Sequence, residues 1–439
     1  MWEHPPAEIR LRGKPRLRER DAQQLRSDFE RCRDGLPRPL EAHVRDAYEI
    51  DLSSEYGGRP VKNPFGKASG QLSLATRQIE KDVEAGLGFV VLKTVIAQDR
   101  AGAQTMHEWA IPETRMVVER IRGRSGPEGW TVTWKGRGWS DSFQAYLDLF
   151  DQALTLARPA GMGVAPSVKY HLPTPEENYW NEEEYGFTTA ALVEVWNRHH
   201  GGGPMPLEKD FSPTLAGSER AAQQTKILEW LDRVPGLIHR AAPGNVTVGL
   251  KIFNTLFEDE FQVRMLDAVE SVPPGQSRAD FLVYANRLFD PQKRFEDKVG
   301  VAYGGPDLSD RNLAILESYL ARDCRRPAVP GGANYRTPLP LSATGDIHSG
   351  RIAAEYFLRG ASSFQMHTLF QLPDSEYAMH GGNKSEKALH LLLFHPEDGF
   401  LAWFLDLRQR LEWPSDAAIP TIARWCRAHW EEIEEELRM

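Results

Sequence analysis

Cysteine is scarce in this chain of 439 residues, which contains only Cys32, Cys324 and Cys426. The three lie far apart and form no Cys-x-x-Cys pair, so we expect neither a disulfide framework nor a four-thiolate iron–sulfur cluster, and we predict no metal site. No stretch approaches about 18 consecutive apolar residues, which argues against a membrane-spanning helix. The first residues are charged and carry no apolar signal segment, so the sequence predicts a cytoplasmic protein with no membrane partner.

Excess positive charge is also absent. The chain has 53 Lys and Arg residues against 62 Asp and Glu residues, a formal net charge of −9, which argues against nucleic acid as a partner. A basic arm near the N-terminus is the exception, and we interpret it as solvated or subunit-contacting, with an anionic partner as the alternative. It contains Arg10, Arg12, Lys14, Arg16, Arg18 and Arg20.

Short apolar runs recur from about residue 61. Their length suits strands that are buried on both faces and is too short for independent helices. The predicted strands are Val61–Ser69, Phe89–Ile96, Gly163–Val168, Ala191–Trp196, Val246–Phe253, Phe281–Ala285, Leu339–Ala343 and Ser362–Thr368.

Amphipathic stretches fill most of the gaps between these runs. The predicted helices are Leu74–Ala85, Phe143–Ala157, Glu219–Ala241, Glu258–Val269, Ser309–Ala321 and Arg351–Leu358. Such alternation predicts an α/β fold, a (β/α)8 TIM barrel of parallel strands, with an open doubly wound sheet as the alternative. We assign residues 1–60 to an N-terminal helical extension, 61–385 to the barrel and 386–439 to a C-terminal helical extension. These extensions favour a homodimer.

Two gaps are too long for a plain helix. Residues 98–141 are rich in Trp and Gly, and the alternation at Trp130–Trp134 is typical of a hairpin. Residues 199–218 are rich in Gly and Pro. Because both follow predicted strands, we expect long loops at the C-terminal face of the barrel, where barrel enzymes hold their active sites.

Two features at the ends of predicted strands indicate an anion site. The loop after the seventh strand is rich in small residues and glycine, a helix is predicted to follow from Arg351, and Gly360 and Ala361 precede the eighth strand; this is the usual composition of a phosphate site in a barrel. Lys93 and Lys251 lie near the ends of very apolar strands, where a lysine needs an anionic or polar partner. Each is either half of a buried ion pair, a cation that faces a bound anion or a reducible ring, or a Schiff-base amine.

Several segments, in order, resemble the dihydroorotate/dihydropyrimidine dehydrogenase family of FMN-binding barrels. The similarity covers about residues 61–370, and the sequence pattern is most similar to that of the pyrimidine-reducing domain of dihydropyrimidine dehydrogenase. The segments are Asn63–Gly70, Glu84–Thr94, Tyr284–Asn286, Tyr303–Pro306, Ala343–Gly350 and Gly360–Gln365.

The resemblance implies FMN as the cofactor. Lys93 and Lys251 would approach the polar edge or the ribityl chain of the flavin, where a cation stabilises the reduced form, and Asn286 would also face the substrate. The positions assigned to cofactor binding are Ala68, Ser69, Lys93, Thr94, Lys251, Asn286, Gly304, Gly305, Gly345, Asp346, His367 and Thr368.

The chain departs from the family pattern around the substrate. Ala191–Trp196, the predicted fourth strand, is followed by neither Cys nor Ser at the place of the family's base, so His199 or His200, together with Lys93, is the candidate catalytic residue. Asn197 is the candidate substrate-binding asparagine, and Trp139 is a candidate stacking residue. Asp346 replaces a phosphate-loop glycine, and its carboxylate has to point away from a phosphate.

These observations predict an FMN-dependent oxidoreductase, a flavoprotein that transfers hydride between flavin N5 and a C–C or C–N bond. The substrate would be a small cyclic, pyrimidine-like or aromatic molecule. The electron donor or acceptor is unknown, since no second nucleotide-binding motif is present. The alternatives are a flavin-free barrel, either a Schiff-base lysine lyase or aldolase, or a non-catalytic binding scaffold.

Overall fold

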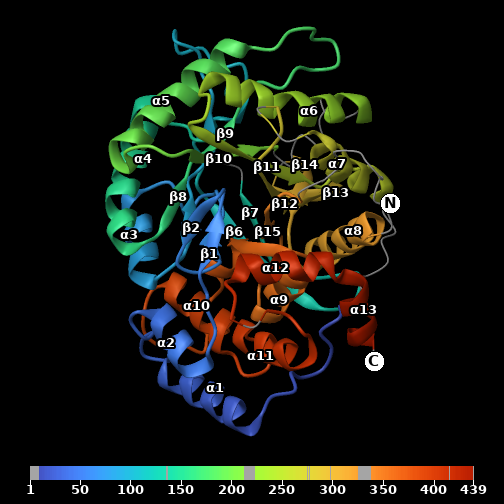
Figure 1. The fold of residues 1–439 in the computed structure, drawn as a ribbon. Helices are drawn as coiled ribbons and strands as arrows, with labels where there is room; N and C mark the ends of the chain where they lie inside the picture. The colour runs from blue at the N-terminus through green and yellow to red at the C-terminus, as the bar shows by residue number, and fades with distance from the viewer. Residues whose placement is uncertain are drawn as a thin grey trace.

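The computed structural model describes residues 9–134, 137–211, 223–273, 275, 277–296, 298–324, 338–414 and 416–438. A barrel of parallel strands lies at its centre, and helices surround the barrel (Figure 1). The barrel is built from β3 (Phe65–Lys67), β4 (Phe89–Val91), β5 (Val95–Ile96), β8 (Gly163–Ala165), β9 (Ser167–Lys169), β10 (Met205–Asp210), β11 (Val246–Phe253), β12 (Phe281–Asn286), β15 (Leu341–Thr344) and β16 (Ala361–Met366).

These ten segments make eight strands that close into a ring. β4 and β5 are two parts of the second strand, and β8 and β9 are two parts of the third, interrupted only at Pro166. β4 pairs with β8 while β5 pairs with β9, and every other neighbour pairs in parallel round to β16 and β3. The ring therefore has no free edge, which confirms the (β/α)8 barrel over the open sheet.

A helix follows each strand and packs on the outside of the barrel, as the periodicity predicts. Phe143–Ala157, for example, is helical over the whole predicted range. The outer helices are α3 (Thr76–Ala85), α4 (Phe143–Ala157), α5 (Glu182–His200), α6 (Gln224–Ala241), α7 (Asp259–Ser271), α8 (Pro306–Cys324), α9 (Gly350–Leu358) and α10 (Lys384–Phe394).

The fourth strand is β10, so the prediction of a strand over Ala191–Trp196 is wrong. That run belongs to α5, whose buried face includes Leu192, Val193 and Trp196. β10 carries charge at Glu208 and Asp210, and it lies in the segment that we expected to be a long loop. A short buried run cannot be told from one face of a buried helix by hydropathy alone, and here the helix is correct.

A short hairpin closes the N-terminal end of the barrel. It consists of β1 (Ser54–Tyr56) and β2 (Arg59–Val61), and Thr247 at the start of β11 donates to the Gly57 carbonyl at 2.7 Å. The Tyr56 ring enters the barrel and stacks on Phe89, with centroids 4.4 Å apart. Phe89 and Phe281 fill the space that Gly66 and Gly249 leave inside the barrel. Rings thus seal this end.

Two further hairpins lie over the C-terminal end. The first, β6 (Met116–Arg122) with β7 (Glu128–Trp134), confirms the hairpin expected around Trp130–Trp134. The second, β13 (Leu288–Phe295) with β14 (Lys298–Tyr303), follows strand six. Arg287 ties the two together, because its guanidinium donates to the carbonyls of Val132 and Ala302. We call these two hairpins the roof.

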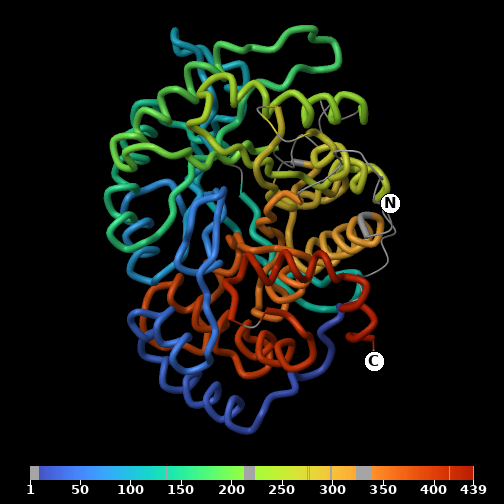
Figure 2. The backbone as a smooth tube through the Cα atoms, viewed as in Figure 1, coloured from blue at the N-terminus to red at the C-terminus, as the bar shows by residue number. Residues whose placement is uncertain are grey.

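Both ends of the chain add helices on one side of the barrel. Figure 2 shows the first helices, in blue, against the last ones, in orange and red. They are α1 (Glu19–Arg31), α2 (Leu40–Tyr48), α11 (Phe400–Arg410), α12 (Ile419–Ala428) and α13 (Trp430–Arg438). In the part of the chain that the structure describes, we find no helix with the length and apolar character that crossing a bilayer requires.

Candidate active site

A cavity lies at the C-terminal mouth of the barrel, below the roof. Loops after strands one, two, six, seven and eight form its wall, and roof residues such as Trp134 and Ala302 cover it. All of the residues that the sequence assigned to cofactor binding line this cavity, from Ala68 on strand one to Thr368 after strand eight. Residues 300 positions apart in the chain therefore converge on a single site.

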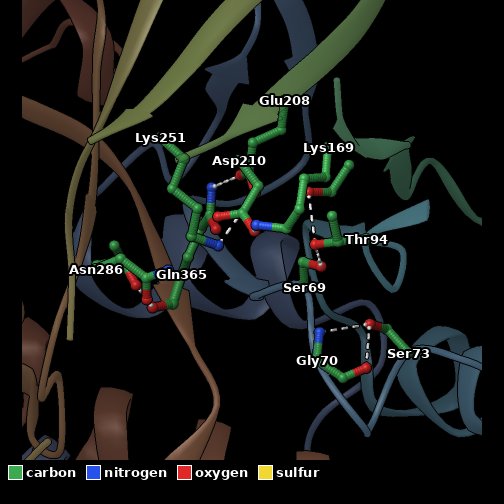
Figure 3. Close-up of polar contacts among 12 residues, drawn as sticks. Ser69, Gly70, Ser73, Thr94, Lys169, Glu208, Asp210, Lys251, Asn286 and Gln365 are labelled. Carbon is green, nitrogen blue, oxygen red and sulfur yellow. Dashed lines mark hydrogen bonds and ion pairs between the residues drawn. The ribbon is translucent and has the colours of Figure 1, made fainter. Parts of the chain in front are cut away.

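Two ion pairs form the charged floor of the cavity. Lys251 on β11 donates to Glu208 Oε1 at 3.0 Å, and Lys169 on β9 donates to Asp210 Oδ2 at 3.3 Å. Figure 3 shows these side chains pointing toward one another from neighbouring strands. Lys93 faces the same Asp210 carboxylate. The two carboxylates thus lie among three lysines, and the excess positive charge suits an anionic ligand.

Burial changes the pKa of the floor residues. Burial lowers the pKa of Lys93 to about 7, with Lys169 and Lys251 adding to this and Asp210 opposing it. Burial alone would raise the pKa of Asp210, but the surrounding lysines outweigh it and hold that pKa below its usual value. Near neutral pH, Asp210 is therefore ionised while Lys93 lies close to its midpoint.

A hydrogen-bond network connects the floor to the N-terminal hairpin. The Tyr56 hydroxyl donates to Glu208 Oε2 at 3.0 Å, and the Gln365 amide donates to the same oxygen at 3.0 Å. Glu208 thus accepts from Tyr56, Gln365 and Lys251 while fully buried. A carboxylate with three donors is held in one orientation, which in turn positions Lys251.

The loop after strand seven turns tightly beside the cavity. Gly345 has φ +113°, and a Cβ there would lie 2.4 Å from Nδ2 of Asn312. Asp346 also has a positive φ, +52°, and its Oδ2 accepts from Ser309 at 3.2 Å and from His348 Nδ1 at 3.1 Å. The carboxylate is thereby bound by two neighbours. Burial would lower the pKa of His348, but Asp346 outweighs it and raises that pKa.

His367, after strand eight, presents a buried N–H group to the cavity. The Gln371 amide contacts Nδ1 at 3.1 Å, which leaves the proton on Nε2, and Nε2 has no partner among the described residues. Gly70 lies directly against this ring, because a Cβ on Gly70 would be 2.4 Å from Nε2. Burial together with Arg287 and Lys93 lowers the pKa of His367 well below its usual value. His367 is therefore a neutral donor.

Four of the residues predicted for catalysis or substrate binding lie elsewhere. His199, His200 and Asn197 are at the C-terminal end of α5, because the strand expected there is a helix. His200 stacks on Trp196, which contacts Arg59 of the N-terminal hairpin, so these residues lie at the opposite end of the barrel. Trp139 packs behind the cavity wall, where its indole N–H donates to the Ser142 carbonyl at 2.9 Å.

The sequence reasoning missed the acidic half of the floor. Glu208 and Asp210 alternate on β10, and both face into the barrel toward the lysines. Their spacing, two residues apart, is the signal that could have revealed them, since alternate residues of a strand share a face. The misplaced fourth strand concealed it. Arg137, which follows the first roof hairpin, also lines the cavity and was not singled out.

Comparisons with known proteins add little to this picture. Neither a protein-family model nor a curated protein sequence matches the chain. Among solved structures, the chain is similar to DHODH from Eimeria tenella, in complex with ferulenol, at 13% identity. The match covers 72% of this chain and 79% of that one, with a TM-score of 0.44. At this distance, function has to be argued from the cavity itself.

Proposed function

We propose that the chain is an FMN-dependent oxidoreductase that acts on a C–C or C–N bond of a small cyclic substrate. One observation carries the proposal. The residues that the sequence assigned to a flavin, which come from six different strands or the segments that follow them, line a single cavity at the mouth of the barrel. Enzymes with this fold hold their active sites at the same face.

The polar groups of the cavity fit a flavin mononucleotide. Four buried polar atoms of its lining have no hydrogen-bond partner among the described residues: Thr133 Oγ1, Asp210 Oδ1, Gln365 Oε1 and His367 Nε2. Buried polar atoms are seldom left unsatisfied, so they indicate a polar ligand. Gly304 adds open space, because a methyl group there would meet protein atoms no nearer than 3.9 Å.

Each part of the cavity would hold a different part of the cofactor. Lys251, fixed by Glu208, would support the polar edge of the ring system. Gly304, Gly345 and the start of α8 present small residues and a helix N-terminus, which favour the phosphate. Because Asp346 is bound by Ser309 and His348, its carboxylate is engaged away from this anion.

Lys93 is the residue that we propose for proton transfer. When bound, FMN supplies hydride exchange at N5, and the substrate must gain or lose a proton in the same reaction. Lys93 lines the cavity, and its pKa of about 7 lets it hold or release a proton near neutrality. The ionised Asp210 beside it stabilises the charged form of the amine.

The visible absorption spectrum of the purified protein is the deciding measurement. We expect flavin bands, and FMN as the chromophore released by heat. Gly304→Ala should weaken FMN uptake at least about tenfold while leaving thermal stability almost unchanged, because its methyl group meets no protein atom within 3.9 Å. A colourless protein that takes up no added FMN would contradict the proposal.

The low pKa of Lys93 also supports a second candidate function. A buried amine that is neutral near pH 7 can attack a carbonyl group, which is the chemistry of Schiff-base lyases and aldolases. This candidate predicts irreversible labelling of Lys93 when borohydride is added together with a carbonyl substrate. A yellow, FMN-containing protein in which Lys93 resists such trapping excludes it.

A further inference from the structure

Tyr56 reaches the charged floor of the cavity from the opposite end of the barrel. Its hairpin is anchored on both sides of it. Ser54 Oγ donates to the Ser362 carbonyl at 2.5 Å, and Thr247 Oγ1 donates to the Gly57 carbonyl at 2.7 Å. The Tyr56 side chain is buried, so its hydroxyl is held at one place inside the barrel.

A single carboxylate, that of Glu208, binds three donors at the floor. Lys251 donates to Oε1 at 3.0 Å, and the Tyr56 hydroxyl and the Gln365 amide both donate to Oε2 at 3.0 Å. Burial, together with Glu208, raises the pKa of Tyr56 well above its usual value, so the hydroxyl keeps the proton that it donates. Lys251 and Gln365 thus lie side by side on one carboxylate, and both line the cavity (Figure 3).

The orientation of the Gln365 amide follows from two neighbours. Its Nε2 lies 3.0 Å from Oε2 of Glu208 and 3.1 Å from the Tyr56 hydroxyl oxygen. A carboxylate can only accept, and a hydroxyl that already donates its proton can also only accept, so both contacts require an N–H group. The Gln365 nitrogen therefore uses both of its hydrogens here, and the amide oxygen has to face away. That oxygen, Oε1, is buried and has no partner among the described residues.

The network presents a hydrogen-bond acceptor and a donor next to each other. Oε1 of Gln365 is the acceptor, and the Lys251 ammonium, which has three N–H groups and gives one to Glu208, is the donor. The complementary ligand edge carries an N–H group beside a carbonyl oxygen, as a cyclic imide does. The isoalloxazine ring has this arrangement at N3–H and C2=O. Without such an N–H group, the buried oxygen would remain unsatisfied at a cost in free energy.

We propose that Gln365 accepts a hydrogen bond from N3–H of the flavin, and that Tyr56 is the positioning residue that turns the amide oxygen toward it. The hairpin at the N-terminal end of the barrel thereby takes part in cofactor recognition without touching the cofactor. The inference deepens the proposed function and rests on it. Asp210 Oδ1 also lacks a partner among the described residues, and the experiment has to separate these two acceptors.

FMN and 3-methyl-FMN are the probes, since they differ only in whether N3 carries a proton or a methyl group. Flavin fluorescence measures the affinity of flavin-free protein for each. We expect the wild-type protein to bind FMN about tenfold more tightly than 3-methyl-FMN. Gln365→Met should abolish this preference. Methionine has a similar length, so a preference caused by the bulk of the methyl group would survive this substitution. Tyr56→Phe should reduce the preference by about threefold or more.

The flavin N3–H signal separates positioning from general stability. With FMN labelled by ¹⁵N at N3, nuclear magnetic resonance should show slow exchange of this proton with water in the wild-type complex, and faster exchange in Tyr56→Phe. Tyr48→Phe is the matched control, because Tyr48 of α2 also donates to a buried carboxylate, that of Asp28 in α1, at 2.7 Å. This control should lose stability and leave the N3–H signal unchanged.

Three results would overturn the inference. The first is equal affinity of the wild-type protein for the two flavins. The second is a preference that survives Gln365→Met, which would mean that Asp210 binds N3–H or that bulk excludes the methyl group. The third is an effect of Tyr56→Phe on N3–H exchange no larger than that of Tyr48→Phe. All three leave the FMN proposal intact, whereas a protein that binds neither flavin contradicts the proposed function and this inference with it.

Discussion

The two halves of the barrel interior are filled in opposite ways. Toward the N-terminal end, Phe89, Phe281 and the inserted Tyr56 pack as rings, in space left by glycines on neighbouring strands. Toward the C-terminal end, lysines and acids project into the barrel from β9, β10 and β11. The barrel interior therefore contains a sealed hydrophobic layer at one end and a charged layer at the other.

The two layers have different roles: the ring layer stabilises the barrel, and the charged layer can bind a ligand. Ring packing stabilises the fold whatever the ligand, because its gain depends only on burial. The charged layer is costly unless every ion is paired, so it is kept where its charges serve a ligand. Glu208 joins the two layers, since it accepts both from Tyr56 below and from Lys251 above.

The largest effect should come from breaking one buried pair. Lys251→Met leaves Glu208 buried without its cation, and we expect the free energy of unfolding to fall by about 3–5 kcal/mol in the ligand-free protein. Denaturant titration measures this. The double variant Lys251→Met with Glu208→Gln should recover most of the loss, because no unpaired charge is left. Equal losses in the single and double variants would show that the pair acts through packing.

A second prediction concerns Lys93 in the charged layer and the pH dependence of the unfolding free energy. Lys93 is charged below pH 10.5 in the unfolded chain but only below about pH 7 when folded. Between these values the unfolded state binds more protons, so Lys93 makes the stability of the ligand-free protein rise with pH by about 1.4 kcal/mol per unit.

The variant Lys93→Met lacks this contribution. Its advantage in unfolding free energy over the wild type should therefore shrink by about 1.4 kcal/mol for each pH unit between about pH 7 and pH 9. Titratable groups that do not interact with Lys93 affect both proteins alike, so the difference reports Lys93 together with its interactions with Lys169 and Lys251. A difference that stays constant over this range would place the pKa of Lys93 in the folded protein outside it.

The smallest effect is expected at the far end of the barrel. His199→Ala and His200→Ala should leave FMN uptake and turnover within about twofold of the wild type, since both residues lie beyond the sealed layer, at the end of α5. Among the described residues, the His199 ring hydrogen-bonds to the half-exposed Asp151, at 3.0 Å. Loss of activity in either variant would contradict this placement and return a histidine to the mechanism.

Much of the architecture could be predicted from the sequence because it depends on local patterns. Apolar runs such as Phe281–Ala285 and amphipathic runs such as Phe143–Ala157 lie where the structure has β12 and α4. The glycine-containing loop after strand seven, together with Lys93 and Lys251, pointed to the cavity. A lysine at the end of an apolar strand and a glycine directly after a strand are each unusual at such a position, so each can be recognised without knowledge of its neighbours in space.

What could not be predicted depends on pairs of residues that are distant in the chain. β10 carries Glu208 and Asp210 inside the barrel, so its pattern lacks the apolar character expected of a buried strand. Their burial is stabilised by Lys251 and Lys169 on other strands, which the sequence cannot show. Meanwhile α5 has a buried run at Leu192–Trp196 that imitates a strand. In both β10 and α5, contacts with residues distant in the chain decided the secondary structure, and local hydropathy did not.

The backbone of Asp346 limits how this position can vary among relatives of the chain. Its left-handed conformation is adopted readily by glycine, asparagine and aspartate, and is unfavourable for branched residues. Drift between glycine and aspartate therefore leaves the turn intact, and only the contacts with Ser309 and His348 are gained or lost. A sequence pattern for chains with this turn should accept all three residue types after Gly345, since a pattern that demands paired glycines would overlook this chain.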